Sequence, residues 1–129
     1  MTPTPAPKLT TIATILAHPR AYDGKLVRIK GAAVVRFEAD YICDRPEMID
    51  SYQIKKCLWL GRTTGFDSDA ISISNLHRKV VDMVGRFHAE DEGHMGAYGG
   101  AISPISATII GVHGRGDVPP PPPPPSSAN

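Results

Sequence analysis

The chain has 129 residues, of which 41% are hydrophobic, so it is long enough for one domain with a modest core. Its 14 Lys and Arg nearly balance its 13 Asp and Glu, which excludes the strongly positive field that drives sequence-independent binding to nucleic acid. No apolar run approaches the roughly 18 residues that span a bilayer, so no membrane-spanning segment is predicted.

Proline-rich segments flank the predicted domain, which is expected over residues 9–113. Residues 1–8, MTPTPAPK, are predicted to be a flexible Pro/Thr-rich leader, similar to the spacer of exported bacterial proteins and lipoproteins. Residues 114–129 are predicted to be a disordered tail that contains the proline run from Pro119 to Pro125. This run favours a polyproline II rod, a ligand for aromatic grooves of partner proteins, although a plain spacer is the alternative.

The first predicted element is a short amphipathic helix in LTTIATILAHP. Apolar residues recur there at helical spacing from Leu9 to Leu16, and Pro19 ends the pattern. A turn at residues 22–24 leads into KLVRIKGAAVVRFE, whose alternating pattern predicts a long strand with a solvent-exposed outer face. Gly31 interrupts this strand, which predicts a bulge or a sharp bend where one strand serves two sheets.

The same design recurs 54 residues later, since KLVRIKG at residues 25–31 matches KVVDMVG at residues 79–85. Between the two copies, DYICD and KKCLWLG predict two further strands joined by a loop, and ISNLHRK is a candidate short helix before the fourth strand. The segment ISPISATIIGV supplies a fifth strand with Ile105, Ala107 and Ile109 on one face.

This order of elements resembles the OB-fold, a small five-stranded Greek-key barrel. The likeness covers roughly residues 22–112 and extends to small bacterial OB-fold proteins, including periplasmic and tRNA-anticodon-like groups. In those proteins a GK-x-V-x-x-x-G first strand and a V-x-x-x-G fourth strand recur, as they do here. The expected class is therefore all-β: an OB-like barrel with a short N-terminal helix and a candidate short helix between strands three and four. An SH3-like barrel is the rival.

In an OB-fold, ligands lie across strands two and three and between the loops that join strands one to two and four to five. The second of these loops is AEDEGHMGAYGGA, residues 89–101, whose glycines suit a hairpin connection. The resemblance therefore implies a ligand surface of aromatic, basic and loop residues. These residues are Arg28, Lys30, Arg36, Tyr41, Trp59, His94, Met95 and Tyr98.

The orientation of Trp59 is open at this point, because the alternation of strand three fits two arrangements. Either Trp59 points outward beside Tyr41 as a stacking platform for bases, or it fills the core. In a plainer alternative, both aromatic residues only cover the barrel and the basic residues keep it soluble.

The chain contains two cysteines, Cys43 and Cys57, in neighbouring predicted strands. They form either a disulfide that closes a 13-residue intervening loop or two buried free thiols, because the strand register is open. A disulfide would place the protein outside the reducing cytosol.

No metal site and no cofactor are predicted, since no C-x-x-C or H-x-x-x-H spacing is present. Catalytic motifs such as a G-x-S-x-G elbow, a P-loop or H-E-x-x-H are also missing from the sequence. A remote alternative is a metal-dependent enzyme in which His88 and His94 hold a metal with Asp91 or Glu92.

We therefore expect a non-enzymatic binding module that contacts another protein in the bacterial envelope or in a secretion system. The role of an inhibitor or immunity factor is compatible with this expectation. The nearly neutral charge, the cysteines and the leader favour the periplasm or envelope over the cytoplasm. A protein partner is preferred to the alternative, which is OB-type binding of single-stranded nucleic acid or another oligomer.

Overall fold

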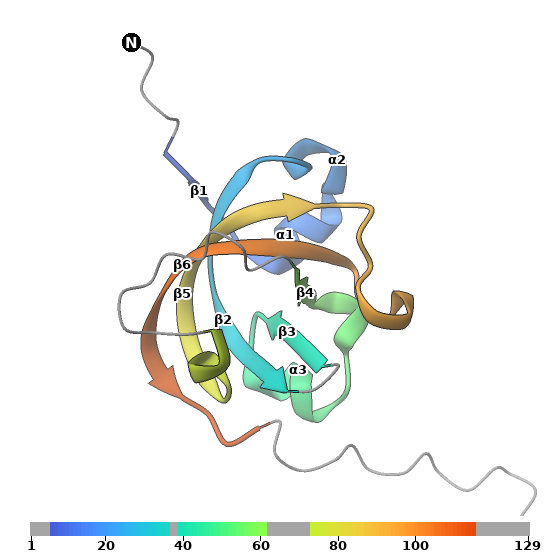
Figure 1. The fold of residues 1–129 in the computed structure, drawn as a ribbon. Helices are drawn as coiled ribbons and strands as arrows, with labels where there is room; N and C mark the ends of the chain where they lie inside the picture. The colour runs from blue at the N-terminus through green and yellow to red at the C-terminus, as the bar shows by residue number, and fades with distance from the viewer. Residues whose placement is uncertain (1–5, 37–38, 62–72, 116–129) are drawn as a thin grey trace, which may run out of the picture.

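Five strands close into a barrel in the computed structural model, which describes residues 6–36, 39–61 and 73–115 (Figure 1). The strands are β2 (Leu26–Arg36), β3 (Ala39–Cys43), β4 (Leu58–Leu60), β5 (Lys79–His88) and β6 (Gly100–Val112). They follow the order β2-β3-β4-β6-β5, and β5 pairs back with β2. The β4–β6 pair is parallel, and the other pairs of the barrel are antiparallel. The expected all-β class with an OB-like barrel is confirmed.

Strand β2 changes its partner in mid-strand, and Gly31 makes this change possible. Residues Leu26 to Ala32 pair with β5, and residues Ala32 to Arg36 pair with β3. A β-carbon at Gly31 would lie 2.4 Å from the carbonyl oxygen of Cys43 and 2.9 Å from a side-chain carbon of Ile42. Only glycine lets the two backbones approach so closely. The bulge or bend between two sheets that was predicted at Gly31 is instead a change of partner within one sheet, at the adjacent Ala32.

The two segments that repeat in the sequence are partners in the barrel. Residues 26–31 of β2 pair with residues 81–86 of β5. Gly85 resembles Gly31, since a β-carbon there would lie 2.6 Å from the carbonyl oxygen of Ser103. The β5–β6 register shifts beside Gly85, where Val84 is opposite Ser106 and Gly85 is opposite Pro104. Ile105 has no partner in this register and forms a bulge. The prediction that Ile105 lies on the same face as Ala107 is therefore wrong.

Alternating side chains from all five strands fill the barrel interior. Val27, Ile29 and Ala33 of β2 are fully buried there, as their spacing predicts. They pack with Ile42, Leu58, Leu60, Val81, Met83, Phe87, Ile102 and Ala107 from the other four strands. Because Leu58 and Leu60 point inward, Trp59 between them lies on the outer face of β4, which settles its orientation.

Short helices add side chains to this interior. Helix α1 (Ile12–Ala17) contributes Ile12 and Ile15, and the 3₁₀ helix η2 (Ile73–Leu76) contributes Leu76. The predicted short helix before the fourth barrel strand is therefore present as η2. The carboxylate of Asp44, at the end of β3, accepts the first N–H groups of α1, from Ile12 and Ala13, at 2.9 Å each.

The N-terminal segment differs from the prediction in two respects. Leu9 does not belong to the helix, because Lys8–Leu9 form a short strand, β1, parallel to β2. Pro19 ends α1 as expected, but it also begins a second helix, α2 (Pro19–Tyr22). Proline is tolerated there because the first residue of a helix needs no N–H for an intrahelical hydrogen bond. No helix within the described residues has the length and apolar character needed to cross a membrane.

A buried histidine holds the chain where it leaves the barrel. The Nε2 atom of His113 lies 3.0 Å from the carbonyl oxygen of Ala33, and its Nδ1 atom accepts the N–H of Arg115 at 3.2 Å. Only a neutral ring with its proton on Nε2 satisfies both contacts. Burial lowers the pKa of His113, and the positive charges of Arg78 and Arg115 lower it further.

Replacing Gly31 with alanine is expected to lower the free energy of unfolding by about 2–3 kcal/mol, because a backbone oxygen occupies the space of the new methyl group. Urea unfolding followed by circular dichroism measures this change. Gly61→Ala is the matched control, since its nearest neighbour would lie 3.6 Å away, and a change within about 0.5 kcal/mol is expected. Equal losses in the two variants would contradict the close approach at Gly31.

Stability is expected to fall as the pH drops below about 6.5, the ordinary pKa of histidine. His113 has a lowered pKa in the fold, so below that pH the unfolded chain binds a proton that the folded chain does not. Urea midpoints between pH 7.5 and 5.5 should fall less steeply for His113→Gln than for the wild type. The same change at exposed His18 should leave the slope unaltered; a wild-type slope in His113→Gln would refute the assignment.

Candidate functional site

A second apolar cluster lies outside the barrel, on the outer face of β2, β3 and β4. Its buried members, here called the outer cluster, are Ala32, Val34, Tyr41, Cys43, Met48, Ile49, Cys57 and Tyr98. The outer face of β2 was predicted to be solvent-exposed along its whole length, and this is wrong at Ala32 and Val34. These two residues are buried because other parts of the chain pack over them.

The connection between β3 and β4 supplies the first part of this cover. It was predicted to be a loop, but it contains a short helix, α3 (Pro46–Asp50), and a 3₁₀ helix, η1 (Ile54–Lys56). Helix α3 packs Met48 and Ile49 into the outer cluster. Pro46 in its first turn is the sequence signal for a helix start that could have revealed it.

A disulfide lies beneath this cover. In the β3–β4 register, Tyr41 is opposite Trp59 and Ile42 is opposite Leu58, which brings Cys43 next to Cys57. The two cysteines are bonded, with their Cα atoms 4.5 Å apart. The bond ties together the two ends of the segment that contains α3 and η1. The register, which the sequence leaves open, thus decides between the disulfide and two free thiols.

The connection between β5 and β6, here called the 89–99 loop, supplies the second part of the cover. Gly93 lies against Trp59 so closely that a β-carbon would be 2.6 Å from a carbon of the indole ring. The ring of Tyr98 has its centroid 5.2 Å from that of Trp59 and 5.4 Å from that of Tyr41. Tyr41 and Trp59, which were considered as a stacking platform, therefore lie beneath the protein's own loop.

A groove of about 230 Å³ remains open between the two parts of the cover. Its floor contains Tyr41 and Tyr98, which are only 4% and 5% exposed, respectively. Its other aromatic and long apolar side chains, Tyr52 and Met95, are 56% and 86% exposed. The remaining lining residues are Arg36, Ala39, Ile54 and Ala97. We call this site the tyrosine groove.

Both exposed residues of the groove have an unfavourable backbone conformation. Tyr52 and Met95 each have a φ of 60°, in the left-handed region that glycine prefers. Such a conformation costs roughly 1–2 kcal/mol for a residue with a side chain. Both conformations belong to local turns. Tyr52 follows the C-cap of α3, where its N–H bonds the carbonyl oxygen of Ile49. Met95 lies in the turn that the N–H of Gly96 closes on the carbonyl oxygen of Gly93 at 3.1 Å. These turns hold the side chains of Tyr52 and Met95 at the rim of the groove.

The floor of the groove offers hydroxyl groups as hydrogen-bond donors. Burial raises the pKa of Tyr41 and of Tyr98, while the positive charge of Arg36 opposes the rise. Both phenols are therefore protonated at neutral pH. Within the described part of the chain, neither hydroxyl has a hydrogen-bond partner, and neither is sealed from solvent.

The structure brings some of the predicted ligand residues together and separates others. The groove is lined by Arg36, Tyr41, Met95 and Tyr98, with Trp59 packed beside Tyr98. Arg28 and Lys30 lie in the part of β2 that pairs with β5 and do not line the groove. Arg28 donates two hydrogen bonds, of 2.9 and 2.7 Å, to the carboxylate of Asp82. The side chain of His94, the first residue of η3 (His94–Gly96), is outside the described structure.

Sequence reasoning missed Tyr52 and Ile54, which also line the groove. Both follow α3, in a segment too short and too mixed in polarity for a periodic pattern to place them.

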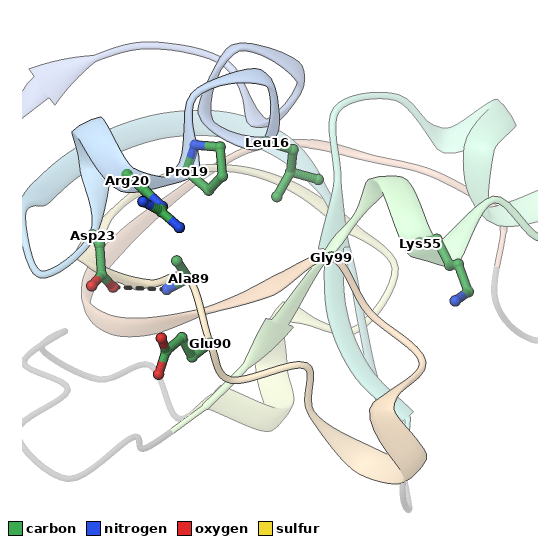
Figure 2. A pocket seen from close by; sticks show the side chains of 8 residues that line it. All are labelled: Leu16, Pro19, Arg20, Asp23, Lys55, Ala89, Glu90 and Gly99. Carbon is green, nitrogen blue, oxygen red and sulfur yellow. Dashed lines mark hydrogen bonds between the residues drawn. The ribbon is translucent and has the colours of Figure 1, made fainter.

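A larger hollow of about 410 Å³ is lined by residues of α1, α2, η1 and both ends of the 89–99 loop (Figure 2). Its lining residues are Leu16, Pro19, Arg20, Asp23, Lys55, Ala89, Glu90 and Gly99. The carboxylate of Asp23 already accepts the N–H of Ala89 at 2.9 Å, and Lys55 stands apart from the other side chains (Figure 2). The four charged residues are exposed, and charges in water contribute little to binding. Compared with this hollow, the tyrosine groove is the stronger candidate site.

Of the residues considered for a metal site, His88, Asp91 and Glu92 have described side chains, whereas His94 does not. No group of three His, Cys, Asp or Glu side chains within the described ranges could hold a metal ion. His88 has its Nε2 atom 3.1 Å from the hydroxyl oxygen of Ser103. Asp91 accepts the N–H of Gly93 at 3.0 Å, which stabilises the turn of the loop.

Loss of the disulfide is expected to lower the free energy of unfolding by about 3 kcal/mol, because the unfolded chain gains the freedom of the opened loop. Urea unfolding of the Cys43→Ala/Cys57→Ala variant under non-reducing conditions measures this loss. A thiol reductant should reproduce most of it in the wild type and should leave the double variant unchanged. A wild type equally stable with and without reductant would contradict the prediction.

The chain matches no protein-family model, no curated protein sequence and no solved structure at a significant level. The case for a function therefore rests on the groove and its residues.

Proposed function

We propose that this chain is a non-enzymatic binding module that contacts another protein through the tyrosine groove. One observation carries the proposal: the large side chains of Tyr52 and Met95 are 56% and 86% exposed beside an aromatic floor. Aromatic residues and methionine are enriched in protein interfaces, where a few side chains supply most of the binding energy.

The size of the groove also favours a protein partner. At about 230 Å³, it is smaller than the roughly 300–1,000 Å³ of typical small-molecule sites. It suits one or two anchoring side chains of a partner, with Tyr52 and Met95 covering them from the sides. The hydroxyls of Tyr41 and Tyr98 and the guanidinium of Arg36 would donate hydrogen bonds to the partner's carbonyl groups.

The proposed setting is the bacterial envelope or a secretion system, where an inhibitor or immunity factor would act. The Cys43–Cys57 disulfide supports an oxidising compartment such as the periplasm. Kinship with small periplasmic OB-fold proteins is part of the same proposal, and the OB-like barrel is compatible with it.

Binding of single-stranded nucleic acid is the second candidate, favoured by the position of exposed Tyr52 near Arg36. Three observations make it the weaker one. The faces of Tyr41 and Trp59 are covered by Tyr98 and the 89–99 loop, Arg28 is paired with Asp82, and the net charge is only +1.

Selection of peptides from a random display library on the immobilised full chain tests the proposal. Selected peptides should bind the Tyr52→Asn/Met95→Asn variant at least about tenfold more weakly, because the anchoring contacts are lost. Asparagine tolerates the left-handed backbone, so these changes should not unfold the protein. Ile110→Asn on β6, another exposed apolar residue, is the matched control and should bind like the wild type.

Equal binding of selected peptides to the wild type and to the groove variant would contradict the proposed site. Tight, salt-dependent binding of a single-stranded oligonucleotide that is lost in Arg36→Ala would instead support the second candidate.

A further inference from the structure

The tyrosine groove has the chemistry that a polyproline II segment needs. A polyproline II helix has no internal hydrogen bonds, so its carbonyl oxygens are free to accept bonds from a partner. Aromatic-lined grooves bind such segments by packing against the proline rings. Here Tyr52 supplies exposed aromatic surface, and the almost fully buried Tyr41 and Tyr98 form the floor. The hydroxyls of Tyr41 and Tyr98 are unpartnered within the described part of the chain.

The chain contains such a segment itself, with seven consecutive prolines from Pro119 to Pro125. The described structure ends at Arg115, four residues before the first of these prolines. Arg115 forms an ion pair with Asp50, the last residue of α3. Tyr52 follows Asp50 by two positions, so the last described residue is tied to the segment that carries one side of the groove.

The length of chain between Arg115 and the first proline is compatible with binding of the proline run in the groove. Four residues from Arg115 to Pro119 span up to roughly 14 Å in an extended chain. Asp50 and Tyr52 are two positions apart in the chain, so their Cα atoms are at most about 7 Å apart. Seven prolines in a polyproline II helix would measure roughly 22 Å, at about 3.1 Å per residue. These lengths would allow the run to reach a groove that Tyr52 borders.

We propose that the tyrosine groove is a polyproline II site and that the chain's own Pro119–Pro125 segment occupies it in the same molecule. This inference rests on the proposed function, because it assigns a ligand class to the same groove. A tethered ligand has an effective concentration in the millimolar range, so even a weakly binding run fills the site. An external partner must then displace the tail or present a better polyproline segment.

Binding of a labelled heptaproline peptide, followed by fluorescence anisotropy, tests the ligand class and the tail together. Three full-length chains are compared: the wild type, a chain with all seven residues 119–125 changed from Pro to Ser, and this chain with Tyr52→Asn/Met95→Asn added. The Pro→Ser chain should bind the peptide. The wild type should bind at least about tenfold more weakly because its own tail competes. The added groove changes should weaken the peptide's binding to the Pro→Ser chain by at least about tenfold.

A nitroxide label on Ser127→Cys of the full chain shows whether the tail binds its own molecule. The methyl resonances of Met95 and Ala97 should broaden, while that of Ile110 should not. The broadening should persist when the labelled protein is diluted with excess unlabelled protein, and it should weaken when residues 119–125 are changed to serine.

Three results would each overturn the inference: no binding of heptaproline to the Pro→Ser chain, equal binding to that chain and the wild type, or broadening that disappears on dilution. The last result would mean that a second copy supplies the tail. In each of these cases, library peptides that bind the groove would still support the proposed function. If the tail binds the groove but no library peptide does, the groove binds only its own chain and the proposed function fails.

Discussion

The contact between the backbone of Gly31 and the carbonyl oxygen of Cys43 is the constraint on which the other features depend. It lets β2 leave β5 and join β3, and this exchange closes the barrel. It also fixes the position of Cys43, and the β3–β4 register then brings Cys57 beside it. The disulfide in turn holds the segment that carries α3 and Tyr52. The position of the groove therefore depends on the close approach of Gly31 to Cys43 inside the sheet.

The sequence predicts the strands well because their inward side chains alternate with a period of two. It fails for the outer cluster, although GAAVV at residues 31–35 is apolar at every position. An apolar run without alternation is typical of a strand buried on both faces, so the signal was present in this part of β2. What covers the second face could not be predicted, because α3 and η1 are too short for periodicity, and the strand register was open.

The candidate residues show the same division between local pattern and tertiary packing. The OB-like order predicted one surface for Arg36, Tyr41, Met95 and Tyr98, and these residues do line one groove. Their exposure depends on how the 89–99 loop folds back, which needs Gly93 to pass directly over an indole ring. The same fold-back leaves Tyr41 and Tyr98 as a buried floor and Met95 outside. Residues from two insertions thus provide the exposed surface, while the barrel provides a rigid base.

The packing of Trp59 has a practical consequence. It is the single tryptophan of the chain and lies between Gly93 and Tyr98, in the layer just below the groove. Indole emission responds to the polarity and packing of its surroundings, and here these are set by the loop that also carries Met95. Any occupant that lifts or tightens the loop changes the surroundings of this one ring. The protein therefore contains its own optical reporter of groove occupancy, which needs no added dye and cannot be confused with a second tryptophan.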